Sequence, residues 1–345
     1  MSNPSFNQAF NQTPATMQAQ VIHAFGEPEQ FRLETVARPT PGPGEVLVRQ
    51  HATSVNPVDY KLRRHGPAAA PALPAILGCD VAGEVVAVGA GVTGFAVGDA
   101  VYGCAGGVRG MPGAYAEYIN ADARLLARKP AALDWRQAAA LPLVGITAWE
   151  GLVDKARVQP GDRVLVLGGS GGVGHVAIQL AKARGAHVTA TVSSPAKAEI
   201  ARALGADAVV NYRDETVADY VGRLTDGHGF DLVFDAVGGD SLNSAMAAAR
   251  PNGQVITIVA SQSYDLSPAH VKGLSLHVVF MPLPMLLNRG REHHGEILRE
   301  LARLADAGQL RPLLDAERFA LADMAAAHRR LESGAAVGKV VVDIG

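Results

Sequence analysis

The stretch VLVLGGSGGVGHVAIQLA, residues 164–181, decides the fold of this chain, because it leads from a β-branched run through five glycines into a helical pattern. Gly169, Gly171 and Gly174 match the spacing G-x-G-x-x-G, with a predicted strand before them and a predicted helix after them. In this setting Gly171 and Gly172 let the backbone approach a pyrophosphate, and Gly174 permits close packing of helix on strand. The helix N-terminus adds unpaired N–H groups. We therefore interpret the stretch as a phosphate-binding loop rather than as a structural turn alone.

The middle of the chain alternates short apolar strands with helices. The predicted strands are residues 163–168, 187–192, 208–211, 231–235, 254–259 and 275–280. The predicted helices between them are residues 173–184, 195–204, 214–224 and 240–249. Alternation of this kind is typical of a parallel sheet that helices cover on both faces. We therefore predict an α/β fold with a doubly wound Rossmann domain over residues 144–281.

The chain on either side of this segment reads as β-rich. Its β-branched runs, which turn sequences separate, include residues 17–25, 45–55 and 81–89. The final run GKVVVDI, residues 338–344, resembles these runs more than it resembles the middle strands. We therefore predict one discontinuous β-rich domain, made of residues 17–143 and 282–345, into which the Rossmann domain is inserted.

The composition limits the classes of function. Lysines and arginines number 31 against 33 aspartates and glutamates, without a basic block, so a nucleic-acid partner is unsupported. Residues 1–16 lack the basic start and apolar core of a signal peptide, and we expect a flexible tail there. The two cysteines, Cys79 and Cys104, suit a reducing compartment. No apolar segment suits a membrane span, and we expect a cytoplasmic protein.

The end of the second Rossmann strand bears on the choice of nicotinamide cofactor. An NAD site usually ends this strand with an Asp or Glu, which binds the ribose 2′-hydroxyl. Here the strand is followed by Ser193, Ser194, Pro195, Ala196 and Lys197. Two hydroxyls and a cation suit a 2′-phosphate, which a carboxylate would repel, so we expect NADPH. The same residues suit a helix start, with Ser194 as the cap and Lys197 in solvent, and both interpretations can hold together.

Six segments carry a resemblance to a known family. They are SVNPVDYKLR (54–63), ILGCDVAGEVVAVGAGV (76–92), LPLVGITAWEGL (141–152), GGSGGVGHVAIQLAKARGA (168–186), LGADAVVNYRDE (204–215) and DAVGGDSL (235–242). Over about residues 17–345 the chain resembles the medium-chain dehydrogenase/reductase superfamily, and within it the zinc-independent, quinone-oxidoreductase-like (zeta-crystallin-like) branch. The resemblance implies a GroES-like catalytic domain around the Rossmann domain, an active site in the cleft between them, and a homodimer formed along the edge of the Rossmann sheet.

The resemblance also implies an active site without zinc. Zinc-dependent members would carry a cysteine at Asn56, a histidine at Cys79 and a cysteine near Leu143, and of these only Cys79 could coordinate a metal. One thiolate does not make a tetrahedral site. Oxidation of a plain alcohol needs a Lewis acid to stabilise the alkoxide. A quinone or an α,β-unsaturated carbonyl instead places charge on a delocalised oxygen, which needs only hydrogen-bond donors or a nearby cation.

These features predict NADPH-dependent reduction of a quinone or an α,β-unsaturated carbonyl. Two alternatives stay open. One is an enoyl-thioester reductase of the same fold, which would need a basic patch for a phosphopantetheine or coenzyme A handle. The other is a structural or regulatory protein that holds NADPH with little turnover.

The resemblance assigns residues to both parts of the site. For the cofactor it implies Thr147, Ser170, Gly171, Gly172, Val173, Gly174, Ser193, Lys197, Tyr212 and Lys339. Asn56 matches the residue that faces the nicotinamide and the substrate in zinc-free members. Tyr60 and Lys61 are candidate donors to the substrate oxygen or to the nicotinamide ribose, with a solvated surface lysine as the alternative for Lys61.

Overall fold

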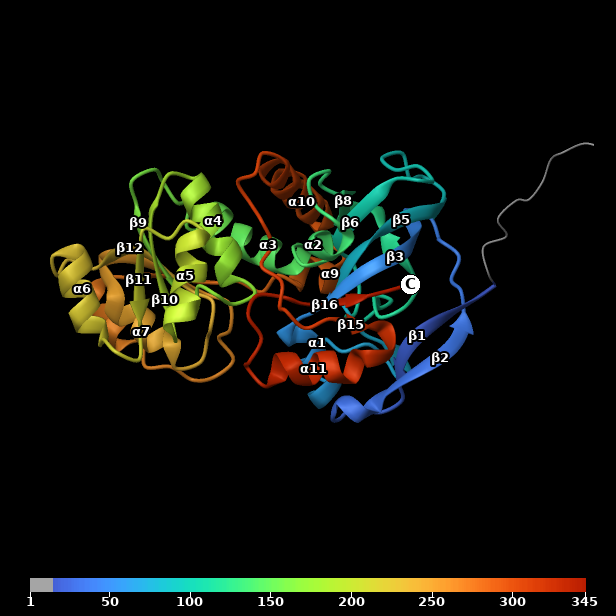
Figure 1. Ribbon diagram of the computed structural model, residues 1–345, viewed down its shortest axis with the longest axis horizontal. Coiled ribbons are helices and arrows are strands. Elements are labelled where there is room, and N and C mark those ends of the chain that lie inside the picture. Colours follow the sequence, from blue (N-terminus) through green and yellow to red (C-terminus); the bar gives the residue numbers. More distant parts are fainter. Residues whose placement is uncertain (1–14) are drawn as a thin grey trace, which may run out of the picture.

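Three β-sheets organise residues 15–345, the part of the chain that this computed structural model describes. A six-stranded sheet forms one half of an elongated molecule, and a seven-stranded and a three-stranded sheet form the other half (Figure 1). The helix α3 (Pro142–Trp149) lies between the two halves.

The six-stranded sheet is parallel and has the strand order β11-β10-β9-β12-β13-β14. Its strands are β9 (Arg163–Leu167), β10 (His187–Val192), β11 (Ala208–Asn211), β12 (Phe230–Asp235), β13 (Ala249–Thr257) and β14 (Ser275–Val278). Alternate residues of β9 belong to two separate apolar clusters. Val164 and Val166 pack in one cluster, and Leu165 and Leu167 pack in the other. Both faces of the sheet are therefore buried, which confirms the predicted doubly wound sheet.

Helices cover both of these faces. They are α4 (Gly174–Ala183), α5 (Pro195–Ala203), α6 (Val217–Thr225), α7 (Ser241–Ala248) and α8 (Ser267–Lys272). Val176 of α4 belongs to the apolar cluster on one face, and Leu242 of α7 belongs to the cluster on the other. The strands and the first four helices match the predicted ranges, apart from the start of β13, whereas α8 is absent from the prediction.

The seven-stranded sheet brings the first and last strands of the chain together. Its order is β15-β16-β3-β5-β6-β8, and β7 pairs with β3. Its strands are β3 (Glu45–Val55), β5 (Asp80–Val88), β6 (Ala100–Cys104), β7 (Tyr118–Asp122), β8 (Leu126–Arg128), β15 (Phe319–Ala320) and β16 (Val340–Asp343). β16 runs antiparallel to β3, with Val342 opposite Thr53. The predicted insertion of the Rossmann fold into a discontinuous β-rich part is thus confirmed.

Smaller elements complete this half. They are the sheet of β1 (Thr16–Ile22), β2 (Phe31–Ala37) and β4 (Ala75–Ile76), and the helices α1 (Pro57–His65), α2 (Trp135–Ala139), α9 (Leu283–Leu287), α10 (Arg291–Asp306) and α11 (Met324–Glu332). α10 packs on β8 and on α3, where a Cβ at Gly145 would lie 2.5 Å from Leu301 Cδ1. The missing side chain lets α10 fix the position of α3.

The bounds of the domains remain our proposal. We place the Rossmann domain at residues 144–281 and the catalytic domain at residues 17–143 and 282–345, because every strand of the parallel sheet lies within the first range. The predicted tail, residues 1–16, lies outside the described residues except for Ala15 and Thr16, and Thr16 already begins β1. No helix within residues 15–345 is long and apolar enough to cross a membrane.

Candidate functional site

The glycine loop between β9 and α4 closes on itself. The N–H of Gly171 donates to Gly168 O over 3.0 Å, and Gly168 has a φ of 75°. A Cβ at Gly174 would overlap Gly168 O, so only glycine lets α4 begin this close to the strand. A Cβ at Gly171 would lie 3.2 Å from Gly168 O, a tight contact but a less severe one. Gly174 therefore serves packing, and a side chain at Gly171 would crowd the loop less.

The loop follows the carboxyl end of β9, which pairs with β12. These neighbouring strands are the point where the strand order reverses, and ligands of open α/β sheets bind outside the carboxyl ends of the strands at such a point. Val237 follows β12, is 57% exposed, and would lie 2.8 Å from a Cβ at Gly168. Val237 thus lies next to the glycine loop. It is absent from the predicted site, although it stands in the quoted segment DAVGGDSL.

The residues expected at the 2′-phosphate gather at the ends of β10 and β11. Tyr212 follows β11, and its N–H donates to Val192 O over 3.1 Å, so Tyr212 lies beside Ser193. Ser194 caps α5 by accepting from the backbone N–H of Lys197 over 3.4 Å. The capping role is therefore present, and no described residue accepts a hydrogen bond from the Lys197 ammonium.

Asn56 stands at the centre of a second, fully buried cluster. It is the N-cap of α1, where its backbone N–H donates to Asp59 over 2.8 Å. Its side-chain Nδ2 donates to Asp80 Oδ2 over 2.8 Å, and its Oδ1 accepts a hydrogen bond from Lys339 Nζ. Both ends of the Asn56 amide are therefore engaged by charged groups.

Asp80, at the start of β5, holds this cluster together. Its Oδ2 accepts from the hydroxyl of Ser54 as well as from Asn56, and its Oδ1 accepts from the backbone N–H of Leu143 over 2.8 Å. The ammonium of Lys339 lies 3.5 Å from Oδ2. We did not predict Asp80 as a site residue. Its position within the quoted segment ILGCDVAGEVVAVGAGV was the only signal in the sequence.

Lys339 joins the cluster to the glycine loop. Its side chain is 3% exposed, and a Cβ at Gly172 would lie 3.3 Å from Lys339 Cδ. The preceding residue, Gly338, donates its N–H to Ser170 O over 3.0 Å. Thr147 of α3 is also buried, with its hydroxyl bonded to Leu143 O over 2.7 Å. Lys339 and Gly338 thus connect the glycine loop with the Asn56 cluster.

Tyr60 and Lys61 lie one turn into α1, and no hydrogen bond connects either side chain to the Asn56 cluster among the described residues. Tyr60 is half-buried, and this burial raises the pKa of its phenol. Lys61 is exposed, as expected from the alternative interpretation that it is a solvated surface lysine.

Behind Asn56 lies a group of buried residues that share Asp59. The carboxylate of Asp59 accepts from Tyr115 OH over 3.0 Å and from Cys79 Sγ over 3.3 Å, and burial raises the pKa of Asp59 to about 6. A hydrogen bond with Cys104, together with burial, raises the pKa of the Cys79 thiol well above its usual range. Cys79 is therefore a protonated donor rather than a thiolate.

These residues do not fit a zinc ion. Of the three positions that would hold ligands in zinc-dependent members, Asn56 is tied to Lys339 and Asp80, Leu143 is apolar, and Cys79 donates to Asp59. Within residues 15–345 no group of three or more His, Cys, Asp or Glu side chains is arranged to hold a metal. The cation at this place is the ammonium of Lys339.

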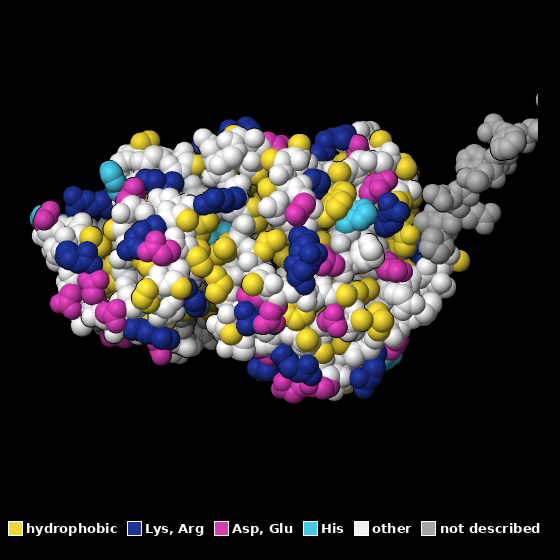
Figure 2. All heavy atoms as spheres, viewed as in Figure 1, with side chains coloured by type: hydrophobic (Ala, Val, Ile, Leu, Met, Phe, Trp, Pro, Cys, Tyr) yellow, Lys and Arg dark blue, Asp and Glu magenta, His cyan; other side chains and the backbone are white. Residues whose placement is uncertain are grey.

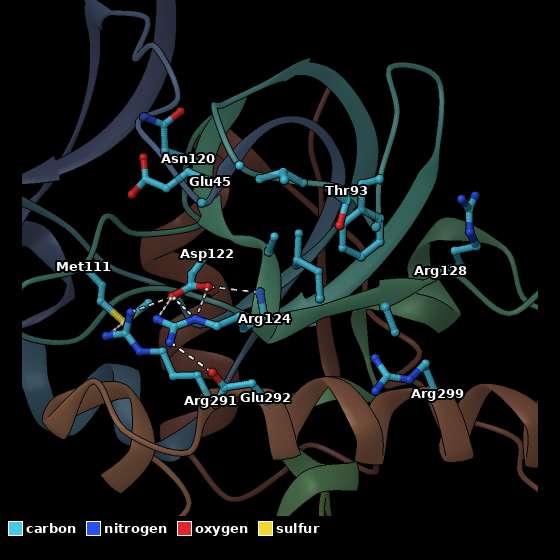
Figure 3. A pocket seen from close by; sticks show the side chains of 18 of the residues that line it. Glu45, Thr93, Met111, Asn120, Asp122, Arg124, Arg128, Arg291, Glu292 and Arg299 are labelled. Atoms are coloured by element: carbon cyan, nitrogen blue, oxygen red, sulfur yellow. Dashed lines mark hydrogen bonds and ion pairs between the residues drawn. The ribbon is translucent and has the colours of Figure 1, made fainter.

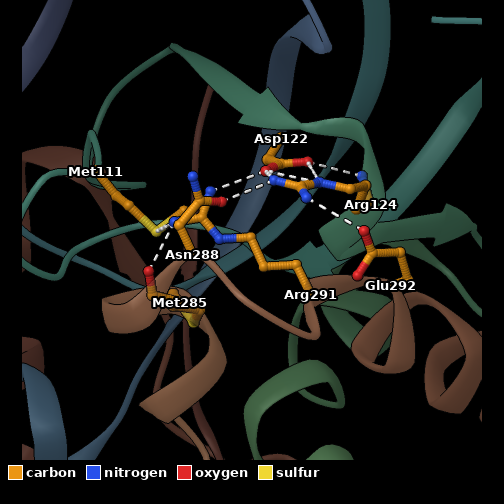
Figure 4. Close-up of polar contacts among 7 residues, drawn as sticks. All are labelled: Met111, Asp122, Arg124, Met285, Asn288, Arg291 and Glu292. Atoms are coloured by element: carbon orange, nitrogen blue, oxygen red, sulfur yellow. Dashed lines mark hydrogen bonds and ion pairs between the residues drawn. The ribbon is translucent and has the colours of Figure 1, made fainter.

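A separate hollow lies away from the Asn56 cluster, and we call it the Asp122 groove (Figure 3). It has a volume of about 1220 Å³ and is bounded by β7, β8, α10 and the loops at residues 43–45, 91–95 and 110–112. Arg124 and Arg291 both bond to the Asp122 carboxylate, at 2.7 and 2.8 Å, and Arg124 also reaches Glu292 (Figure 4). The groove uses the face of α10 opposite Leu301, and no residue of the Asn56 cluster lines it.

Comparison with known families and proteins agrees with this architecture. Residues 42–131 match the alcohol dehydrogenase GroES-like domain, and residues 204–342 match the zinc-binding dehydrogenase family. The chain is 35% identical to a 2-methylene-furan-3-one reductase of Solanum lycopersicum, over 95% of this chain and 79% of that protein. It is 35% identical to a quinone oxidoreductase of Pseudomonas aeruginosa, over 92% of this chain and 97% of that protein.

Solved structures are similar over almost the whole chain. An alcohol dehydrogenase superfamily protein from Novosphingobium aromaticivorans is 44% identical, with a TM-score of 0.91 over 96% of this chain and 100% of its own. A mycobacterial protein, Rv1454c, solved as a complex with NADPH, is 31% identical, with a TM-score of 0.83 over 95% of this chain and 99% of its own.

Proposed function

The chain belongs to the medium-chain dehydrogenase/reductase superfamily, in its quinone-oxidoreductase-like branch, and from this premise we propose that it transfers a hydride from NADPH to a quinone or an α,β-unsaturated carbonyl without a metal ion. The observation that carries the proposal is the meeting of the glycine loop and the Asn56 cluster at Lys339. A cofactor held by the loop would bring its reactive end toward the buried ammonium of Lys339, which lies beside Asp80.

NADPH is supported by the residues at the ends of β10 and β11. Ser193 and Tyr212 lie side by side there, Lys197 is the nearby cation, and the sequence has no carboxylate between Ser193 and Lys197. We assign the pyrophosphate to Ser170, Gly171, Gly172, Val173 and Gly174, where the N-terminus of α4 offers N–H groups. Thr147 and Lys339 are assigned to the nicotinamide side.

The chemistry asks for hydrogen-bond donors rather than for a Lewis acid. When bound, NADPH supplies the hydride, which goes to the β-carbon of an enone or to a quinone. Negative charge then develops on the carbonyl oxygen, and a fixed N–H near that oxygen stabilises the transition state more than the ground state. We assign this donor to Asn56, with Tyr60 and Lys61 as further candidates on the same helix.

Turnover measurements test the proposal directly. NADPH oxidation is followed with 1,4-benzoquinone, 9,10-phenanthrenequinone and simple enones, and with crotonyl coenzyme A as the enoyl-thioester alternative. We expect turnover with quinones and enones, unchanged by a chelator. Turnover with the thioester alone would favour the enoyl-thioester reductase, and NADPH binding without any turnover would favour a structural or regulatory role.

The choice of cofactor is tested at Lys197. A charge-assisted hydrogen bond contributes roughly 1.5–3 kcal/mol, so Lys197→Ala should weaken NADPH binding by about ten-fold or more. NADH binding should change little, because NADH lacks the 2′-phosphate. Calorimetric titration with both cofactors measures this, and equal affinity of the unmodified protein for NADH and NADPH would contradict the assignment.

We also propose a homodimer that forms at β14, the edge strand of the parallel sheet. Large apolar side chains are exposed on and after this strand, with Val278 at 51%, Phe280 at 53% and Leu287 at 61%. An uncovered edge of this kind is a template for pairing with a second copy.

Lys and Arg mix with Asp and Glu over the face shown in Figure 2, which suits small-molecule rather than nucleic-acid partners. The two free cysteines suit the cytoplasm.

Light scattering tests the dimer. The unmodified chain should elute with twice the chain mass, and Phe280→Arg should shift it toward the monomer, because an arginine in an apolar contact is costly. A monomer at all concentrations would contradict the proposal.

A further inference from the structure

We propose that Asp80 is the positioning residue of this site: with Lys339, its carboxylate sets which end of the Asn56 amide is presented for hydrogen bonding. The inference rests on the proposed function, since it names the residue that prepares Asn56 for the reaction. Asp80 itself is fully buried and is not assigned a contact with substrate or cofactor.

The orientation of the Asn56 amide follows from the chemistry of its two partners. A carboxylate only accepts hydrogen bonds, and an ammonium only donates them. Asp80 therefore requires Nδ2 on its side, and Lys339 requires Oδ1 on the other. A reversed amide would place a donor against the ammonium and an acceptor against the carboxylate. One N–H of Nδ2 then remains without an assigned acceptor, and a donor is what a developing oxyanion needs.

Asp80 also connects the segments of the proposed site that must be positioned relative to one another. Its Oδ1 accepts from the N–H of Leu143 in the first turn of α3, where a carboxylate is favoured by the helix dipole. That helix carries Thr147, on the nicotinamide side. Through Lys339 the same carboxylate is linked to the glycine loop at Gly172. One side chain thus connects β3, α1, α3 and the last strand.

A purely stabilising role would not account for this arrangement. Asp80 and Lys339 are 0% and 3% exposed, and a buried ion pair contributes little to stability compared with apolar residues of the same size. The ion pair can instead fix the orientation of a neighbouring polar group. Here that group is the side-chain amide of Asn56.

The first readout does not depend on activity. In protein labelled with ¹⁵N at asparagine, the side-chain amide of Asn56 is identified by its loss in Asn56→Ala. Asp80→Asn should shift this signal and increase its exchange with solvent, because the carboxylate acceptor is gone. Asp122→Asn, which removes a carboxylate paired with two arginines in the same half, should leave it unchanged. An unshifted signal in folded Asp80→Asn overturns the proposal even if the enzyme reduces neither quinones nor enones.

The second readout is kinetic. Asp80→Asn should lower kcat for an enone at least ten-fold while changing the Kd for NADPH less than three-fold.

A double variant separates positioning from stability. Asp80→Asn with Lys339→Met removes both charges and should recover the thermal stability lost in Asp80→Asn alone. It should not recover kcat, because neither partner then orients Asn56. Full recovery of kcat in the double variant, or an equal loss of kcat in Asp122→Asn, would show that Asp80 acts only as a buried counter-charge.

Discussion

Two carboxylates in the catalytic half, Asp80 and Asp122, have opposite surroundings. Asp80 is fully buried, and its carboxylate accepts from three residues in two segments, Ser54 and Asn56 in one and Leu143 in the other, with one lysine beside it. Asp122 lines the Asp122 groove and is paired with two arginines there (Figure 4). The Asp122 groove holds charges that neutralise one another. The Asp80 cluster instead brings residues 54–56, Leu143 and Lys339 together, and Lys339 lies against the glycine loop.

The largest difference between the two regions should appear when a cation is removed. Lys339→Met leaves Asp80 buried without a counter-ion, which should cost about 3–5 kcal/mol of unfolding free energy. Arg291→Met leaves Asp122 paired with Arg124, and should cost about 1 kcal/mol. Urea unfolding of both variants measures the two losses. Equal losses would remove the distinction between the clusters.

The two regions should also respond to pH with opposite signs. Burial raises the pKa of Asp59, beside Asn56, from 3.8 to about 6. The contribution of Asp59 to the free energy of unfolding is therefore present below pH 4 and is lost as the pH rises toward 6. Burial acts to raise the pKa of Asp122, but hydrogen bonds from Arg124 and Arg291 lower it, so its share is present above pH 4 and is lost as the pH falls.

Subtracting the unfolding free energy of an asparagine variant from that of the unmodified protein isolates each group. For Asp59→Asn this difference should fall by about 3 kcal/mol between pH 4 and pH 7. For Asp122→Asn it should rise with pH below about 4 and stay level above that. The same slope for both variants would contradict the assigned environments.

Two glycines, one in each region, should differ in how well they tolerate an added methyl group. Gly174→Ala forces a Cβ against Gly168 O and should cost about 1–3 kcal/mol, with a weaker Kd for NADPH because α4 must move. Gly94 lines the Asp122 groove, and a Cβ there meets nothing within 4 Å, so Gly94→Ala should stay within about 0.5 kcal/mol. Thermal unfolding and NADPH titration decide this, and a harmless Gly174→Ala would disprove the packing role.

The smallest effect is expected at the exposed cations of the groove. Arg299 has no hydrogen bond or ion pair to another described residue, so Arg299→Ala should change stability by less than about 0.5 kcal/mol. Turnover with NADPH and an enone should be unchanged. A large loss of turnover would instead make the groove part of the reaction.

The Rossmann half could be predicted from the sequence because its signals are local. The strands from β9 to β14 are short apolar runs, and the helices between them have amphipathic spacing and caps such as Ser194 and Thr216. α8 escaped prediction because it is one short turn-like segment of six residues. α3 has no periodic pattern, since Val144, Ile146 and Ala148 are buried on different sides between the two halves.

The Asn56 cluster was only partly predictable because its contacts are distant along the chain. Asn56 could be identified from its segment, but its partners Asp80 and Lys339 are 24 and 283 residues away. An aspartate that opens a strand looks like an exposed turn residue until the strand is placed against α3. Val237 was missed for a related reason, since only the strand order puts it opposite the glycine loop.

The pairing of the last strand, β16, with β3 sets the order in which this protein matures during its synthesis. Domains generally fold as units while the ribosome extends the chain from its N-terminus. The parallel sheet is complete once β14 has emerged, and so the Rossmann half can form while Lys339 is still untranslated. Asp80 and Asn56 must wait for that lysine, which is the counter-ion of the one and the donor to Oδ1 of the other. A nascent chain would therefore form its glycine loop before it completes the Asn56 cluster.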